Sequence, residues 1–429
     1  LADAVALLVR ELGVLGPVIV TMLVTMRLRK HKRVYLLEYS LFEPPPHWRS
    51  SKADIMEMLR SARSAGGDEQ DRSFTDTDIT FMEKVLANSG TGEGTAWPPG
   101  ICNAKEGKPI DDSLSAAREE ATTVLCGCLG RLFAETGVKP KEVDFLVINC
   151  SLFSPTPSLC ALVANHFRMR SSLRSFNLSG QGCSASLLSV DLASELLQNN
   201  PNSVAVVIST ELITQSLYHG HEKSMLLQNT LFRCGGAALL LTNHIRLAWK
   251  AKYQLKQLVR TQCSDDESYN AVFECQDGTG CQGIRLSKEI VRVAGNAMKI
   301  NLTQLGPLVL PLSEQLKVVL SIVRAKFAKK GLPRGKYVPS FKTAIDFFCI
   351  HAGGRAVLDG IEKNLRLLPT DMAPSRTVLL ERGNTSSSSI WYELAHIEAE
   401  GKIRRGHKVL QLAFGSGFKC NSAVWVRLR

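Results

Sequence analysis

A cysteine on a glycine-rich loop is the first candidate for chemistry in this chain. Cys183 follows Gly180-Gln-Gly and precedes residues 184–197, whose small and apolar side chains predict a buried helix. A thiol at the N-terminus of a helix lies near the positive end of the backbone dipole, which lowers its pKa and favours the nucleophilic thiolate. A free cysteine is also often just a small buried apolar side chain. The local pattern alone leaves both interpretations open.

Two further polar residues lie on loops of similar composition later in the chain. His351 begins His-Ala-Gly-Gly-Arg directly after an apolar run at residues 344–350 that predicts a strand. Asn384 stands between Gly383 and a run of serines. A lone histidine at a strand end is often a core residue, and Asn384 also suits the cap of the following helix. A Cys, a His and an Asn on Gly- or Ser-rich loops, in this order, nevertheless indicate a nucleophile with two polar donors.

Alternating helices and strands would position these three residues. One series of predicted elements surrounds Cys183, with helices at residues 116–135 and 158–169 and strands at 144–149, 204–209 and 237–242. A second series surrounds His351 and Asn384, with helices at 286–299, 313–329, 355–368 and 390–401 and strands at 344–350, 409–414 and 423–428. This alternation predicts an α/β fold whose sheet is covered on both faces. The polar, turn-rich stretch 250–283 is expected to be a connector and a surface hairpin.

The motifs, taken in order, resemble the condensing enzymes of the thiolase superfamily. More narrowly, they resemble the membrane-bound 3-ketoacyl-CoA synthases of very-long-chain fatty acid elongation, from about Val34 to the C-terminus. The motifs that carry the resemblance are Asn149-Cys-Ser-Leu-Phe-Ser-Pro, the Cys183 loop, Lys223-Ser-Met-Leu, Leu231-Phe-Arg-Cys-Gly-Gly, Asn301-Leu-Thr-Gln-Leu-Gly-Pro, His351-Ala-Gly-Gly-Arg, Gly383-Asn-Thr-Ser-Ser-Ser-Ser and Phe414-Gly-Ser-Gly.

The resemblance implies a thiolase-like fold, with two similar α/β halves in a five-layered αβαβα arrangement and an N-terminal membrane-associated helix. The expected divisions are a membrane anchor and basic flank at 1–33, a cap or linker region at 34–110, a half carrying the nucleophile at 111–283, and a half carrying His and Asn at 284–429.

The resemblance also implies a role for each candidate residue in a decarboxylative Claisen condensation of acyl-CoA with malonyl-CoA. Cys183 would take the acyl group, while His351 and Asn384 would hold the malonyl thioester oxygen as carbon dioxide leaves. The backbone N–H of Cys183 and one from the turn of Gly415, Ser416 and Gly417 are the candidate oxyanion donors. Neither a metal nor a redox cofactor is expected.

Three positions depart from the family pattern, since Gln262, Phe347 and Leu380 stand where similar synthases have histidine. These departures put normal activity and substrate preference in question. The alternatives are therefore a condensing enzyme like type III polyketide synthase, one like 3-oxoacyl-carrier-protein synthase III, and a non-catalytic scaffold of an elongase complex.

The N-terminal sequence and the net charge favour a membrane partner. Residues 12–26 are uncharged, and the basic cluster 27–33 that follows fits a cytosolic flank. Similar synthases usually carry two spans, and the first is expected to be missing from this sequence. The net charge of +12 suits anionic lipid and CoA phosphates, because no nucleic-acid recognition motif is present. We expect an endoplasmic reticulum enzyme with a cytosolic catalytic domain, a homodimer, and contact with other elongase-complex enzymes.

The cysteines agree with a reducing compartment. The chain has 12 of them, scattered without the paired spacing of a zinc site or a disulfide framework.

Overall fold

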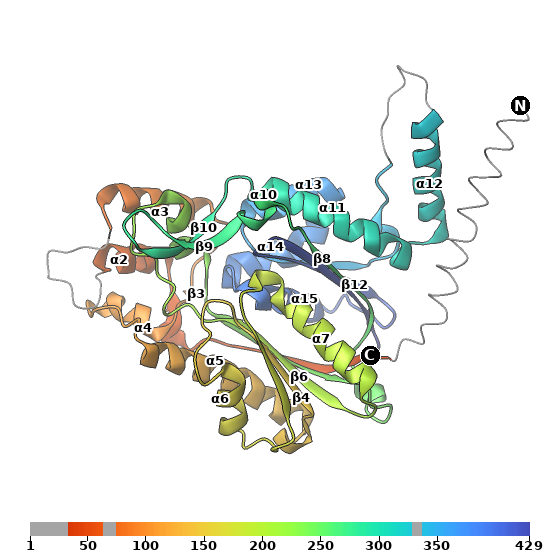
Figure 1. Ribbon diagram of the computed structural model, residues 1–429, viewed down its shortest axis with the longest axis horizontal. Helices are drawn as coiled ribbons and strands as arrows, with labels where there is room; N and C mark the ends of the chain where they lie inside the picture. The colour runs from red at the N-terminus through yellow and green to blue at the C-terminus, as the bar shows by residue number, and fades with distance from the viewer. Residues whose placement is uncertain (1–32, 63–73, 328–336) are drawn as a thin grey trace, which may run out of the picture. The chain divides into compact units, whose positions relative to one another are not determined.

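A computed structural model describes residues 33–62, 74–327 and 337–429 of the chain. Residues from Val34 to Arg429 form one compact unit, which is a mixed α/β fold (Figure 1). Across the described residues, no helix is both long enough and apolar enough to cross a bilayer. The predicted N-terminal membrane helix lies outside the described residues.

Five strands form the half of the sheet next to Cys183. Their order is β5 (Arg174–Leu178), β4 (Phe145–Asn149), β6 (Val204–Glu211), β7 (Gly235–Thr242) and β1 (Tyr35–Leu41). The strand β4 is parallel to β5 and β6, whereas β7 is antiparallel to both β6 and β1. Nearly continuous burial along β4, β6 and β7 fits strands covered on both faces.

Four strands form the other half of the sheet and repeat this order. They are β11 (Phe347–Ile350), β12 (Lys408–Gly415), β13 (Lys419–Arg427) and β8 (Tyr253–Gln262). This half matches the first both in the order of strands across the sheet and in their order along the chain, with β11, β12, β13 and β8 in the places of β4, β6, β7 and β1. Two residue pairs between β1 and β8, Tyr35 with Gln254 and Leu36 with Tyr253, join the halves into one nine-stranded sheet.

Three of these strands lie in stretches to which the sequence pattern gave other roles. The strand β8 lies in the expected connector 250–283, β1 in the expected cap region, and β5 in the expected loop before Cys183. The interpretation of β8 as a connector is wrong because its polar residues alternate with buried ones, and its hydrogen bonds go to β13, which is far away in sequence. The rest of that stretch is a hairpin, as predicted, formed by β9 (Val272–Gln276) and β10 (Gln282–Leu286).

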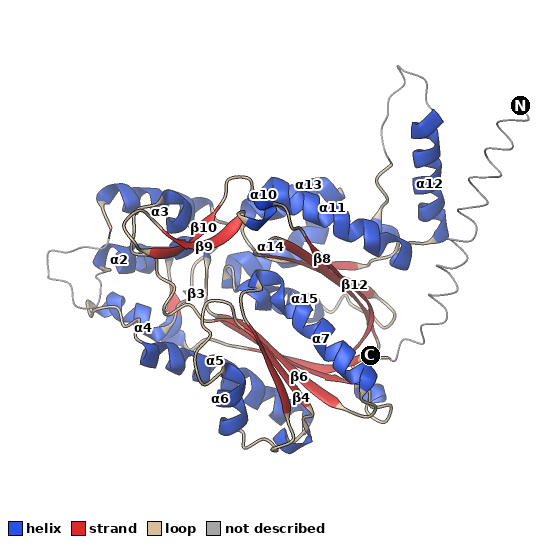
Figure 2. Cartoon of the chain, in the orientation of Figure 1, coloured by secondary structure: helices blue, strands red, loops and turns tan. Residues whose placement is uncertain are grey.

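Helices form three layers around the two halves of the sheet, and Figure 2 shows these helices in blue alternating with the strands in red. The outer face of the first half is covered by α5 (Leu114–Thr136) and α6 (Leu159–His166). Between the halves lie α7 (Ala185–Asn199) and α15 (Ser389–Ala399), and α7 contacts strands of both. The outer face of the second half is covered by α11 (Ile290–Val309), α13 (Arg355–Leu365) and α14 (Pro369–Arg382).

The remaining elements lie around this core. They are α2 (Lys52–Ser61), α3 (Asp76–Asn88), α4 (Pro99–Cys102), α8 (Lys223–Leu226), α9 (Gln228–Leu231), α10 (Asp266–Tyr269), α12 (Leu312–Phe327) and the short pair β2 (Arg49–Ser50) and β3 (Thr95–Ala96). The helix α5 contains the predicted helix at residues 116–135 and extends it by two residues at its start and one at its end. Ser113 caps it by accepting a hydrogen bond from the Ala116 N–H at 3.2 Å, and Gly137 ends it at φ +69°.

Tryptophan side chains connect the middle layer to the sheet. The indole N–H of Trp391, on α15, donates to the Ser186 hydroxyl of α7 at 2.6 Å. Its ring lies 6.0 Å from the ring of Trp425, on β13, in an edge-to-face arrangement. Both tryptophans are fully buried in the apolar cluster shared by the two halves. Trp391 therefore couples the helix after the serine run to the helix after Cys183.

Replacing Trp391 by alanine should lower the free energy of unfolding by about 3–5 kcal/mol, because it leaves a cavity between the halves. The midpoint of urea unfolding, followed by circular dichroism, measures the effect. Trp249→Ala is the matched control, since Trp249 is 74% exposed and its removal should change stability by only about 0.5 kcal/mol or less. Equal midpoints for the two variants would contradict the assigned role of Trp391.

Candidate active site

Cys183 lies in a 3-10 turn, Gly182–Ser184, that leads directly into α7. The predicted arrangement of loop, cysteine and helix is therefore confirmed. Gly182 has φ +64°, and a Cβ there would lie 2.6 Å from the backbone nitrogen of Ser416. A Cβ on Gly415 would lie 2.5 Å from the carbonyl oxygen of Gln181. The turn after β12 thus presses against the Cys183 loop, and both contacts require glycine.

The thiol of Cys183 has an environment that opposes ionisation. Burial raises the pKa of this thiol to about 12; the Ser386 hydroxyl acts in the opposite direction and the Glu211 carboxylate adds to the rise. The sequence-based expectation of a lowered pKa is therefore wrong. Removal of the sulfur from water and a nearby buried carboxylate outweigh the favourable field at the start of α7.

Ser386 and Glu211 form a hydrogen-bonded chain with the thiol. The Ser386 hydroxyl oxygen lies 3.4 Å from Cys183 Sγ and 2.9 Å from Glu211 Oε2. The other carboxylate oxygen of Glu211 accepts from the N–H groups of Ser151 and Leu152, each at 2.7 Å. Burial raises the pKa of Glu211, although these donors stabilise its charged form. Ser386 itself is held at φ +54°, an unusual conformation for a residue with a side chain.

His351 follows β11 and is buried as a neutral imidazole. Burial lowers its pKa to about 4. Its Nδ1 lies 2.8 Å from the hydroxyl of Ser389, on α15. When that hydroxyl donates to Nδ1, the ring hydrogen resides on Nε2, where it can be donated to a ligand. A Cβ on Gly353 would lie 3.1 Å from Nε2, so glycine leaves room beside this nitrogen.

Asn384 is fixed by two hydrogen bonds from its side-chain amide. Its Oδ1 accepts from the Ser386 N–H at 2.9 Å, and its Nδ2 donates to the Gly353 carbonyl at 3.2 Å. These bonds fix which end of the amide carries the donors. An amide nitrogen has two hydrogens, so Nδ2 retains one to donate to a ligand oxygen.

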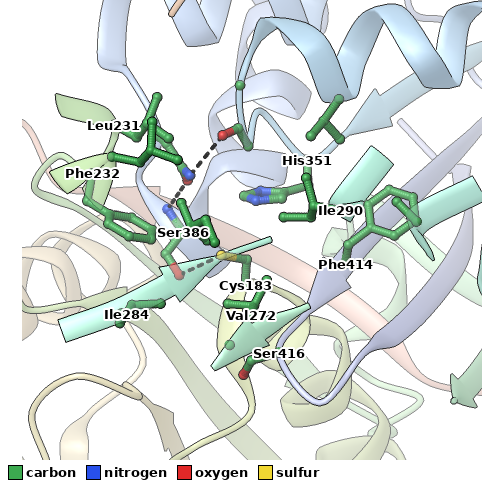
Figure 3. A pocket seen from close by; sticks show the side chains of 18 of the residues that line it. Cys183, Leu231, Phe232, Val272, Ile284, Ile290, His351, Ser386, Phe414 and Ser416 are labelled. Atoms are coloured by element: carbon green, nitrogen blue, oxygen red, sulfur yellow. Dashed lines mark hydrogen bonds between the residues drawn. The ribbon is translucent and has the colours of Figure 1, made fainter. Parts of the chain in front are cut away.

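A single cavity of about 660 Å³ brings these side chains together (Figure 3). Cys183, His351 and Asn384 all line it, although they are far apart in sequence. Its other walls are mainly apolar and come from α3, the end of α9, α11, β12 and the β9–β10 hairpin. They include Phe81, Val85, Leu231, Phe232, Val272, Ile284, Leu286, Ile290, Val291 and Phe414. The volume lies within the range of roughly 300–1,000 Å³ common for small-molecule sites.

The turn predicted to supply an oxyanion donor reaches the cavity in part. Gly415 and Ser416 line it, whereas Gly417, at φ +71°, is not among the lining residues.

The three positions that depart from the family pattern also lie outside the cavity lining. Phe347 starts β11 and packs against His407, with ring centroids 5.6 Å apart. Gln262 is exposed at the end of β8, and Leu380 is 53% exposed on α14. Their side chains therefore do not touch the three predicted site residues.

Glu211, Ser386 and Ser389 were not singled out by the sequence analysis. Glu211 ends β6, a buried strand whose first five residues are apolar, and a carboxylate at that place was the available signal. The serines stood within a uniform run, so their separate contacts could not be distinguished before the fold was known.

A nucleophilic thiol beside two neutral N–H donors, in a mainly apolar cavity, suits acyl transfer through a thioester. The thiol can take an acyl group, and the donors can stabilise a developing enolate or alkoxide oxygen. The apolar walls suit the hydrocarbon part of a substrate.

The chain matches two family models in succession. One, described as FAE1/Type III polyketide synthase-like protein, matches residues 26–327. The other, described as 3-oxoacyl-acyl-carrier-protein (ACP) synthase III C terminal, matches residues 341–427.

Curated relatives match most of the chain. The chain is 50% identical to 3-ketoacyl-CoA synthase 4 of Arabidopsis thaliana over 398 residues, which cover 92% of this chain and 74% of that protein. It is 49% identical to 3-ketoacyl-CoA synthase 5 of the same plant, with 92% and 78% covered.

Solved structures show the same fold at low sequence identity. PKS-I from the brown alga Ectocarpus siliculosus matches with a TM-score of 0.70 at 16% identity, over 92% of this chain and 98% of that one. A type III pentaketide synthase from Neurospora crassa matches with a TM-score of 0.69 at 18% identity, over 92% and 99%. At this identity the likeness supports the fold alone.

The raised pKa of Cys183 predicts how its alkylation depends on pH. Below a pKa of about 12 the reactive thiolate is a minor species, so the rate with iodoacetamide should rise about tenfold for each unit of pH between about pH 7 and pH 10. Mass spectrometry of the Cys183 peptide measures that rate, with N-acetylcysteine as the unburied control. A rate that is already constant below about pH 8 would show a preformed thiolate.

Proposed function

The chain belongs to the 3-ketoacyl-CoA synthase family of acyl-condensing transferases, and on that premise we propose how its site works. Cys183, His351 and Asn384 together condense a long-chain acyl-CoA with malonyl-CoA in very-long-chain fatty acid elongation. The observation that carries this assignment is their convergence on one mainly apolar cavity. The proposed chemistry uses no metal or redox cofactor.

Acyl transfer to Cys183 is the first step. The sulfur attacks the carbonyl carbon of the acyl-CoA thioester, and the CoA sulfur leaves with the electrons of the broken carbon–sulfur bond. Because the resting thiol is neutral, its proton must move. The Ser386 hydroxyl, 3.4 Å from Sγ and 2.9 Å from Glu211, can relay that proton to the carboxylate. The departing CoA thiolate then takes up one proton, which completes the balance.

Decarboxylation of malonyl-CoA is the second step. Carbon dioxide leaves, and the electrons of the broken carbon–carbon bond form an enolate on the thioester. His351 Nε2–H and Asn384 Nδ2–H donate hydrogen bonds to the enolate oxygen, as neutral groups that stabilise its charge without transferring a proton to it. Neutrality of His351 follows from burial, which lowers its pKa to about 4.

Carbon–carbon bond formation is the third step. The enolate carbon attacks the acyl-Cys183 carbonyl, the tetrahedral oxyanion collapses, and Cys183 leaves as thiolate. The thiolate then takes back, through Ser386, the proton that Glu211 accepted in the first step. The backbone N–H of Cys183 and one from the Gly415–Ser416 turn are the proposed donors to that oxyanion. The contact of this turn with Gly182 supports the assignment, while Gly417 serves the geometry of the turn.

A membrane location and assembly with other proteins complete the proposal. The N-terminal residues anchor the catalytic unit to the cytosolic face of the endoplasmic reticulum, where lipid and other elongation enzymes are its neighbours and a second copy forms a homodimer. The support for an anchor is the uncharged run 12–26 followed by the basic cluster 27–33.

Substitutions should separate the roles of the three residues. Cys183→Ala should take no label from a radioactive long-chain acyl-CoA. His351→Ala and Asn384→Ala should still become labelled at Cys183 but release roughly 10²–10³-fold less carbon dioxide from malonyl-CoA, since each loses a donor to the enolate. A panel of acyl-CoAs with labelled malonyl-CoA, with and without a carrier protein, measures the whole reaction and tests the carrier-protein alternative. Full condensation by Cys183→Ala would refute the assignment.

Removing the proposed proton acceptor should affect the first step specifically. Glu211→Gln keeps the size of the side chain but cannot accept the proton at neutral pH. We expect at least about tenfold slower acyl labelling of Cys183, with carbon dioxide release from malonyl-CoA little changed, because general base catalysis contributes at least that much. Unchanged labelling would exclude the relay through Ser386.

Removal of residues 1–26 should release much of the protein from microsomal membranes while the unit from Val34 onward still folds. Carbonate extraction followed by immunoblotting measures the membrane-bound fraction, and circular dichroism checks the fold. If the truncated protein resists carbonate extraction as the full chain does, the anchor lies elsewhere.

A further inference from the structure

The helix α12 exposes a row of large apolar side chains. Its exposed apolar residues follow helical spacing, so they share one face, and they are between 44% and 74% exposed: Leu312, Leu316, Val319, Leu320 and Val323. Nowhere else in the described part of the chain do so many large exposed apolar side chains lie on one element. An apolar patch of this kind on a protein surface usually marks a binding surface.

The orientation of α12 is set by polar contacts on its other side. The buried carboxylate of Glu314 accepts from the Tyr337 hydroxyl at 2.7 Å and from the Ser340 N–H at 3.0 Å. The Ser321 hydroxyl accepts from the Tyr337 N–H at 2.8 Å. The side of the helix that carries Glu314 and Ser321 therefore contacts its own chain, and the apolar side faces outward.

Figure 1 shows α12 extending away from the sheet beyond α11. Within the described residues, no other helix or strand packs along α12. Contact between water and this apolar side carries a free-energy cost that another apolar phase would remove.

The charge of the surrounding sequence indicates the kind of surface that this face meets. No Asp or Glu occurs from residue 315 to residue 345. The same stretch contains these basic residues: Lys317, Arg324, Lys326, Lys329, Lys330, Arg334, Lys336 and Lys342. Lys317 and Lys342 are ion-paired with Glu314 and Asp371, so the positive charge comes from the other basic residues of this sequence. A basic sequence that adjoins an apolar helix face is complementary to anionic phospholipid, whose head groups attract Lys and Arg while the acyl chains accept apolar side chains.

We propose that the exposed face of α12 docks onto a bilayer containing anionic phospholipid, with the helix lying in the plane of the interface. Its 16 residues span only about 24 Å, which is shorter than a bilayer core. This contact is separate from the N-terminal anchor and does not depend on the chemistry assigned to Cys183. It also has a structural link to the site, since α11 lines the cavity with Ile290 and Val291 and leads directly to α12.

Fluorescence quenching by brominated lipids tests the docking in the full chain. Leu320→Trp places a reporter on the proposed face, and Ile245→Trp is the matched control, because Ile245 is 78% exposed after β7. With vesicles of phosphatidylcholine and phosphatidylserine, we expect the added fluorescence of Leu320→Trp to be quenched at least about threefold more than that of Ile245→Trp. The difference should shrink as salt is raised, because salt screens the charges.

Two results of that experiment would overturn the proposal. One is equal quenching of the two reporters, and the other is equal quenching of Leu320→Trp by vesicles of phosphatidylcholine alone. The first would show that α12 does not meet the bilayer, even if residues 1–33 hold the protein on the vesicles, and the second would show that anionic lipid is not what this face recognises.

A double substitution distinguishes lipid from protein as the occupant of the face. Leu316→Ser with Leu320→Ser should reduce the fraction that floats with anionic vesicles, compared with Ile245→Ser, and leave the molar mass in solution unchanged. Condensing activity without vesicles should equal that of the unsubstituted protein, which shows that the variant is folded. A dimer that light scattering detects in the unsubstituted protein but not in the double variant would assign the face to a second copy instead.

Discussion

Two backbone segments from opposite halves of the molecule meet beside the nucleophile at distances that leave no room for a side chain. Gly182 belongs to the loop after β5, and Gly415 ends β12 in the other half. Their contact fixes the Cys183 turn relative to the strands that deliver His351. The cavity, the hydrogen bonds of Ser386 and the positions of the two donors all require that the halves meet here. The middle layer supports this contact, because Trp391 packs between α7 and β13.

The cost of this arrangement is desolvation, since His351 and Asn384 are buried and Cys183 is only partly exposed. The same burial that raises the pKa of Cys183 lowers that of His351, so both rest in neutral form. In the proposed reaction this is an advantage for the imidazole, because a neutral donor can bind a developing enolate without giving up its proton. For the thiol it is an obstacle, which gives Glu211 a reason to lie buried within reach of Ser386. Desolvation therefore distinguishes the proposed roles of these side chains, which the residue types alone could not do.

The three candidate residues that line the cavity and most elements could be picked out from the sequence because their signals are local. Loop glycines, apolar runs and caps such as Ser113 can be recognised within a few residues. What could not be predicted depends on pairing across the fold. The strand β8 reads as polar connector until β13 is placed beside it, and Glu211 gains a role only when the serine run arrives next to it. The pKa of Cys183 was misjudged because the helix end is local and the surrounding desolvation is not.

The place of β1 in the sheet has a consequence for how the chain must fold. It is the first described strand in sequence, yet it lies between β7 and β8, and Tyr35 pairs with both Thr242 and Gln254. During synthesis, β1 leaves the ribosome long before either neighbour, and such distant pairing is slow to form. Until then its apolar residues, including Leu36 and Tyr39, are an unpaired strand prone to wrong partners. The first half of the chain can pair β1 with β7 once residues 235–242 have been made, while the other edge of β1 stays open until β8 follows.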